Sequence, residues 1–137
     1  MPPEAVPPEA VPPAEVPRLI GLMDIVVHLS RREGLARALP QALAASRPIV
    51  ACDCDGASEV CLDGRTGYLV RPGDREELVA HVLRLANDAS LRQQLGQQGR
   101  DFVVERFSTT RMVNELHQLY CRLGAPDVGK VTGFERT

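Results

Sequence analysis

The chain has 137 residues, enough for one domain with a buried core but too few for a two-domain enzyme whose active site lies between its lobes. Hydrophobic residues make up 44% of the sequence and charged residues 25%, and the formal net charge is -2, so nothing in the composition favours nucleic acid as a partner. No apolar stretch reaches the roughly 18 residues that span a bilayer, and we therefore expect a protein without a transmembrane segment, located in the cytoplasm.

The first 17 residues differ in composition from the rest of the chain. Residues 2–17 read PPEAV PPEAV PPAEV P, a five-residue unit nearly repeated three times. Paired prolines favour polyproline II and are incompatible with a helix interior or a central strand. We interpret residues 1–17 as a disordered leader, with a partner-binding segment as the alternative.

From Arg18 onward, apolar runs typical of buried strands alternate with amphipathic stretches typical of helices. The prolines and glycines between them mark the turns. The expected elements are a helical turn over 19–23, a strand over 24–29, a helix over about 36–46, a strand over 49–52, a short helix over 57–61 and a third strand over 68–70.

Three more helices are expected in the second half of the chain. Asp74 and Ser108 are good N-caps for the first and the last of them, and the middle one, over about 90–105, is expected to break near Gly99. Residues 124–137 show no periodicity and are expected to form a flexible tail. The alternation predicts an α/β fold, a three-layer Rossmann-like parallel sheet over residues 18–123, with the C-terminal helices packing across one edge.

Four cysteines raise the question of a metal site, because three of them lie close together. Cys52, Cys54 and Cys61 do not have the paired C-x2-C spacing of zinc sites, and no histidine nearby completes a ligand set. Cys52 lies in an apolar run, where a small buried thiol suits a strand. We therefore interpret the cysteines as structural and expect no metal.

Ligands of parallel α/β sheets bind at the carboxyl ends of the strands, so the loops after the expected strands are the place to look for a site. The segment that follows residues 24–29 contains Gly34 just before a helix. A glycine lets the backbone approach a ligand closely, and the amides of a helix's first turn attract anions. This segment is therefore a candidate diphosphate site, although a plain helix entry would have the same pattern.

A succession of short motifs, which occur in order and at regular intervals, makes the interpretation of this candidate site more specific. These motifs are MDIVVHLS (23–30), REGL (32–35), QALAA (41–45), RPIVA (47–51), DGASEV (55–60), GRTGYLV (64–70), PGD (72–74), LRQQLG (91–96) and ERFS (105–108). Through them the chain resembles the C-terminal, nucleotide-sugar donor-binding half of family 4 glycosyltransferases of the GT-B fold, from about residue 19 to residue 123.

The resemblance implies specific roles for two positions that are eight residues apart. Family members hold the donor with two glutamates, of which the first contacts hydroxyls of the donor sugar and the second contacts the ribose. Glu33 matches the first and is the candidate catalytic residue. Gln41 stands at the second position, where an amide still offers hydrogen bonds to hydroxyls but a charged acceptor is lost.

The remaining candidate donor-binding residues follow from the same resemblance. The turn formed by Gly34, Leu35 and Ala36 corresponds to the loop that holds the diphosphate and the sugar, and Ser30 lies in the loop before it. A second loop frames the donor cleft and contributes Asp55, Gly56 and Glu59, although Glu59 could simply cap or pair locally.

The resemblance implies that the chain binds a nucleotide sugar for retaining glycosyl transfer, with the nucleotide sugar as substrate and no cofactor. The acceptor-binding N-terminal lobe is absent from these 137 residues, and we expect that lobe to be the partner and the isolated chain to be inactive in transfer. The alternative is a non-catalytic nucleotide-binding or interaction domain that retains the fold.

Overall fold

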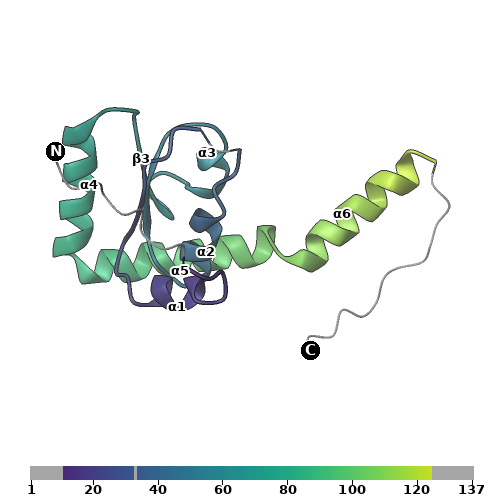
Figure 1. Cartoon of the computed structure of the whole chain (residues 1–137), viewed down its shortest axis with the longest axis horizontal. Coiled ribbons are helices and arrows are strands. Elements are labelled where there is room, and N and C mark those ends of the chain that lie inside the picture. Colours follow the sequence, from purple (N-terminus) through teal and green to yellow (C-terminus); the bar gives the residue numbers. More distant parts are fainter. Residues whose placement is uncertain (1–10, 33, 125–137) are drawn as a thin grey trace, which may run out of the picture.

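The computed structural model describes residues 11–32 and 34–124. Within these residues strands and helices alternate in the predicted order through the first two thirds of the chain, and helices alone follow (Figure 1). The elements are α1 (Val16–Gly21), β1 (Val26–His28), α2 (Ala38–Ala44), β2 (Ile49–Cys52), α3 (Ala57–Val60), β3 (Gly67–Val70), α4 (Arg75–Asn87), α5 (Ala89–Arg106) and α6 (Thr109–Arg122).

The strands form one parallel sheet in the order β1-β2-β3, which confirms the predicted parallel α/β fold. All four residues of β2 are buried, as the apolar run Ile49–Cys52 predicted. The prediction that the first strand is buried on both faces is wrong, because Val27 in β1 is 45% exposed. The reason is the position of β1: among the described strands it lies at the edge of the sheet, and α4 packs mainly against β2 and β3.

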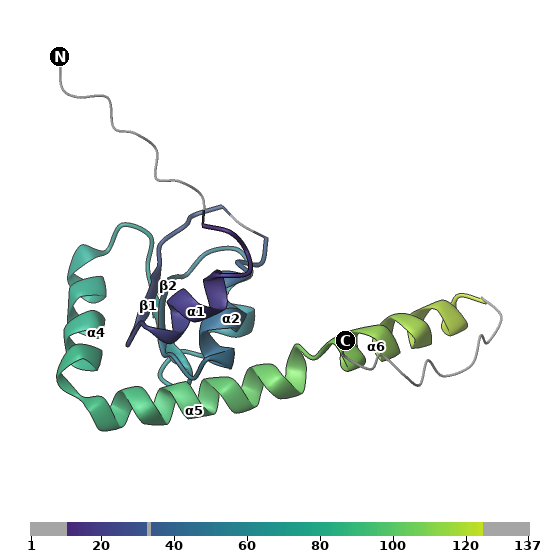
Figure 2. The same cartoon turned by 60° about the horizontal axis from the view of Figure 1, so that its bottom comes forward.

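Helices cover both faces of the sheet, so the fold has three layers (Figure 2). Side chains along β2 alternate between the two cores: Ile49 and Ala51 join α1, α2 and α3, while Val50 joins α4 and the first half of α5. The period-two alternation of a strand is what supplies apolar side chains to both layers.

Helix α5 crosses the edge of the sheet that holds the amino ends of the strands, since its Gly96 lies against Ser46, shortly before β2 begins (Figure 2). The predicted break near Gly99 is wrong, because α5 continues unbroken through it. Gly96 and Gly99 serve close packing instead. A Cβ at Gly96 would overlap the carbonyl oxygen of Ser46, and a Cβ at Gly99 would overlap the side chain of Leu43.

The end of α2 explains why Ser46 faces α5. The backbone N–H of Ser46 donates to the carbonyl of Leu43 over 2.9 Å, and that of Arg47 donates to Ala42 over 2.9 Å. This is the Schellman pattern, which requires a left-handed residue after the helix, and Ser46 has a φ of 56°. The turn leaves the carbonyl of Ser46 directed at Gly96.

Helix α6 does not pack on the sheet, although both final helices were expected to do so. It begins as predicted, because the hydroxyl of Ser108 accepts the N–H of Arg111 over 3.2 Å. It then extends away from the sheet and its covering helices (Figures 1 and 2), and none of its residues is buried. Four of its large apolar side chains are exposed, namely Met112, Leu116, Leu119 and Tyr120.

The ends of the domain also fall at slightly different places from the predicted ones. Helix α1 begins at Val16, inside the segment interpreted as a leader, because proline is tolerated in a first helical turn and Pro17 stands there. Val16 also packs against the core. Residues 1–10 of that segment and residues 125–137 of the expected tail lie outside the described residues. None of the helices in the described ranges combines the length and the apolar character needed to cross a membrane.

Candidate functional site

Because the three strands are parallel, their carboxyl ends lie at one edge of the sheet, and the loops that follow them meet there. These loops cover residues 29–37 after β1, 53–56 after β2 and 71–74 after β3. Most of the predicted site residues lie in the first two loops. Glu33, the predicted catalytic residue, lies outside the described residues.

The first two loops are held together by their backbones at two glycines. The N–H of Gly56 donates to the carbonyl oxygen of Gly34 over 3.0 Å. A Cβ at position 56 would overlap this carbonyl oxygen, so only glycine fits there without displacing a loop. The sequence motifs indicated both glycines as site residues, but they did not reveal this contact between them.

Gly34 presents the opposite case, because nothing in the described chain requires a glycine there. A Cβ built at Gly34 has no atom within 4 Å, and Gly34 is not among the glycines with positive φ. The missing side chain therefore leaves open space above the backbone at this point. A ligand that approaches the backbone closely is the physical reason for a glycine that neither packing nor conformation demands.

The loop after Gly34 offers backbone donors. None of the described residues accepts the N–H groups of Leu35 and Ala36. Helix α2 begins at Ala38, two residues later than predicted, and Pro40 in its first turn has no N–H. The donors available to an anion are therefore mainly those of the loop, and a helix of seven residues adds little dipole to them.

A thiol also connects the two loops. The Sγ of Cys54 donates to the carbonyl oxygen of Ser30 over 3.0 Å. Burial and a hydrogen bond with Cys52 raise the pKa of the Cys54 thiol from 9.0 to about 11, so it is protonated at neutral pH. Cys54 therefore acts as a neutral donor that fixes the loop around Ser30, in line with a structural role.

The other three predicted site residues lie in the second loop or on the helices that follow the two loops. Gln41 is exposed on α2, and no described residue accepts or donates a hydrogen bond to its side chain. Asp55 has a φ of 47°, a conformation that aspartate tolerates better than most residues, and this places it at the tip of the second loop. Glu59 is exposed on α3, which has no side-chain cap, so the alternative of local capping is not observed.

The contact between the glycines leads to a stability prediction. Gly56→Ala is expected to lower the free energy of unfolding by about 1–3 kcal/mol, because the methyl group forces the two loops apart. Gly34→Ala is the matched control and is expected to change it by less than about 0.5 kcal/mol. Urea unfolding followed by circular dichroism measures both. Equal losses for the two variants would contradict the described contact.

A second prediction concerns the buried thiol of Cys61. Burial, together with the carboxylate of Asp63, raises the pKa of this thiol from 9.0 to about 12. Well below pH 9 the thiol is protonated in the folded and the unfolded chain alike, and its contribution to stability is intact. As the pH rises from 9 toward 12, only the unfolded chain ionises, so stability falls, by about 1.4 kcal/mol at pH 10.

Cys61→Ala removes this titration and is therefore expected to lose less stability between pH 8 and pH 10 than the unaltered chain. The variant starts from a lower stability because it leaves a cavity, and the comparison rests on the change with pH alone. Parallel losses in the two chains, measured by urea unfolding, would show that Cys61 does not titrate as described.

The third loop was only loosely indicated by the sequence. Residues 71–74 lie beside the first loop and, with Arg31 and Arg75, border a cavity that the motifs did not reveal. The sequence did contain a signal for this cavity, because Arg31 and Arg75 each lie within five residues after the end of a strand.

The chain has a parallel sheet with helices on both faces and with glycines in the loops at the carboxyl edge. This is the architecture of open α/β domains, which bind ligands at that edge. Residues 8–102 match the family described as glycosyl transferases group 1, and the chain belongs to this family. It is 32% identical over 98 residues to the capsular polysaccharide biosynthesis glycosyltransferase CapM of Staphylococcus aureus. That match covers 72% of this chain and 26% of CapM, so the chain spans about a quarter of the length of this relative.

Solved structures confirm the fold. The C-terminal domain of a group 1 glycosyl transferase (LpcC) from Francisella tularensis matches with a TM-score of 0.67 and 27% identity, over 73% of this chain and 51% of that one. HepE from Anabaena, in complex with UDP-glucose, matches with a TM-score of 0.74 and 23% identity, over 79% of this chain and 30% of that one. The fold is that of the C-terminal lobe of GT-B glycosyltransferases, as the resemblance implied.

Proposed function

We propose that this chain is the donor-binding lobe of a retaining family 4 glycosyltransferase and that it binds a nucleotide sugar at the loop formed by Gly34, Leu35 and Ala36. The observation that carries the proposal is the open space above Gly34 beside the unpaired amides of Leu35 and Ala36. Membership of the group 1 family and the UDP-glucose in the HepE structure support the same class of ligand.

The loop is suited to a diphosphate for electrostatic reasons. Backbone N–H groups are fixed donors, and several of them acting on one anion stabilise it without the cost of ordering long side chains. During transfer the bond between the anomeric carbon and the diphosphate oxygen breaks, a bond to the acceptor oxygen forms, and the proton of the acceptor hydroxyl passes to an oxygen of the departing diphosphate. Negative charge then gathers on the departing nucleoside diphosphate, where the loop amides stabilise it.

The sugar and the ribose lie on either side of the diphosphate in this proposal. Glu33 holds hydroxyls of the donor sugar, and Gln41, on the exposed side of α2, faces the ribose. Transfer further requires an acceptor held beside the donor in a water-poor cleft. A second lobe supplies that acceptor site, and the 137-residue chain alone is expected to show binding without turnover.

The test is a binding screen of the purified chain by ligand-observed NMR or calorimetry against UDP, GDP, ADP and their sugar conjugates. One nucleotide and its sugar are expected to bind, and Gly34→Ala is expected to weaken binding tenfold or more without a change in melting temperature, because its methyl group fills the ligand's space. Absence of binding by all the nucleotides, or unchanged affinity of Gly34→Ala, would refute the donor site.

A third prediction concerns the ribose. Gln41→Glu is expected to preserve or strengthen nucleotide binding, by about 0.5–1.5 kcal/mol, since a carboxylate accepts hydrogen bonds from ribose hydroxyls more strongly than an amide does. Calorimetry on the unaltered chain and the variant measures the difference. Loss of binding in a variant that keeps its circular dichroism spectrum would place Gln41 away from the ribose.

A further inference from the structure

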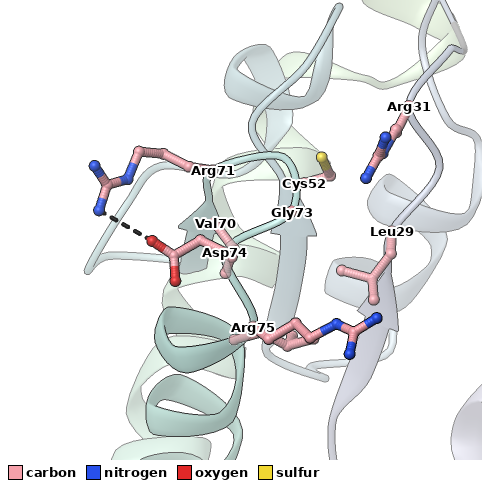
Figure 3. A pocket seen from close by; sticks show the side chains of 9 residues that line it. Leu29, Arg31, Cys52, Val70, Arg71, Gly73, Asp74 and Arg75 are labelled. Carbon is pink, nitrogen blue, oxygen red and sulfur yellow. Dashed lines mark hydrogen bonds and ion pairs between the residues drawn. The ribbon is translucent and has the colours of Figure 1, made fainter.

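A cavity of about 210 Å³ lies at the carboxyl edge of the sheet, between the loop after β1 and the start of α4 (Figure 3). Its apolar lining comes from the ends of all three strands and from α4, through Leu29, Cys52, Val70 and Leu78. Its polar lining consists of arginines and one carboxylate, namely Arg31, Arg71, Arg75 and Asp74. An apolar floor with charged groups at the rim is the usual composition of a small-molecule site.

The charges at the rim do not cancel within the described chain. Arg71 pairs with Asp74 over 3.1 Å and with Glu77 over 3.6 Å, and its guanidinium points away from the cavity (Figure 3). Asp74 is also occupied as the N-cap that accepts the N–H of Glu77 over 3.0 Å. The one carboxylate of the lining is therefore already matched.

Arg31 and Arg75 have no hydrogen-bond or ion-pair partner among residues 11–32 and 34–124. Arg31 reaches across the mouth of the cavity, and its Nη2 would lie 3.9 Å from a Cβ at Gly73. Arg75 extends along the other side of Leu29 (Figure 3). It is also the first residue of α4, where the helix dipole disfavours a cation. An anion bound at this rim would offset the unpaired charges of the two arginines and the unfavourable position of Arg75 at the helix start.

We propose that this cavity binds a phosphate monoester attached to a small apolar or aromatic body. The phosphate lies at the rim over Leu29, where Arg31 and Arg75 reach its oxygens from either side, and the apolar body rests on Val70 and Leu78. Cavities for drug-sized ligands measure about 300–1,000 Å³, so 210 Å³ admits a phosphate and one ring but not a whole nucleotide sugar. The site is therefore additional to the donor loop at Gly34.

The test is a titration of the full ¹⁵N-labelled chain with phenyl phosphate, inorganic phosphate and phenol, observed through amide chemical shifts. Phenyl phosphate is expected to shift the amides of Gly73 and Arg75 and to bind more tightly than inorganic phosphate or phenol. Arg31→Gln and Arg75→Gln are each expected to weaken phenyl phosphate binding about ten- to hundredfold, as loss of a charged hydrogen bond predicts. Arg65→Gln, an exposed arginine at the amino end of β3, is the matched control and is expected to bind unchanged.

Three outcomes would overturn the proposal. Absence of shifts at Gly73 and Arg75 would show that the cavity takes no phosphate, and equal affinity for phenyl phosphate and inorganic phosphate would show that its floor takes no apolar body. A parallel loss of nucleotide-sugar binding in Arg31→Gln and Arg75→Gln would make the cavity part of the donor site. In that last case the donor function stands and the separate site does not, so the two proposals are distinguishable.

Discussion

Glu33→Gln is expected to weaken binding of the intact nucleotide sugar about ten- to hundredfold while leaving the bare nucleoside diphosphate almost unaffected. The family motif places this carboxylate against hydroxyls of the donor sugar, and a charged hydrogen bond to such a group is worth about 1.5–3 kcal/mol. The side chain lies outside the described residues, so the expectation rests on the motif REGL and on the neighbouring loop at Gly34. The amide variant keeps the shape of the side chain and removes only its charge.

Paired titrations with the nucleotide sugar and the nucleoside diphosphate separate this role from a structural one. A glutamate near a helix start also interacts with the helix dipole, worth about 0.3–1 kcal/mol, and that effect does not depend on the sugar. Similar losses for both ligands, or a lower melting temperature with no loss for either, would return Glu33 to the structural role. Glu76→Gln is a useful control, because this exposed carboxylate lies in the first turn of α4 and has no assigned role in donor binding.

Gly96→Ala is expected to lower the free energy of unfolding by about 1–3 kcal/mol. Alanine is the better helix former by about 1 kcal/mol, so propensity alone predicts the opposite sign. Packing decides, because the added methyl group overlaps the backbone carbonyl of Ser46, which the turn after α2 holds in place and which cannot move aside like a flexible side chain.

Gly21→Ala is the matched control for this substitution. Gly21 is also helical, at the end of α1, and a Cβ there has no atom within 4 Å. It is expected to leave stability unchanged or to raise it by a few tenths of a kcal/mol. Chemical denaturation of the two variants measures the difference, and a stabilised Gly96→Ala variant would contradict the close contact between α2 and α5.

The sequence predicted the parts of the fold that depend on local pattern. The strands at 49–52 and 67–70 are short apolar runs, and the N-caps Asp74 and Ser108 act through residues three positions away. Local pattern does not report which helix an element meets in space. Gly99 therefore predicted a break when it in fact marks a contact with Leu43, a residue more than 50 positions earlier.

The same difference between local pattern and distant contacts applies to the candidate site. The motifs indicated the loops at Gly34 and Gly56, because each glycine stands just before a predicted helix. They did not predict the hydrogen bond between the two loops, or the cavity at Arg31 and Arg75, since both depend on the register of neighbouring strands. Register follows from the packing of the whole sheet and leaves no short signature.

The contact between α2 and α5 also has a consequence for the order of folding. Arg100 in α5 donates to the carbonyl of Ala44 in α2 over 2.6 Å, and 56 positions separate the two residues. Contacts between distant residues close a long loop, so their entropy cost comes before their packing is gained, and they tend to form after local units such as β1, α2 and β2. Substitutions at Gly96 and Gly99 are therefore expected to speed unfolding more than they slow folding, and to shorten the lifetime of the folded chain.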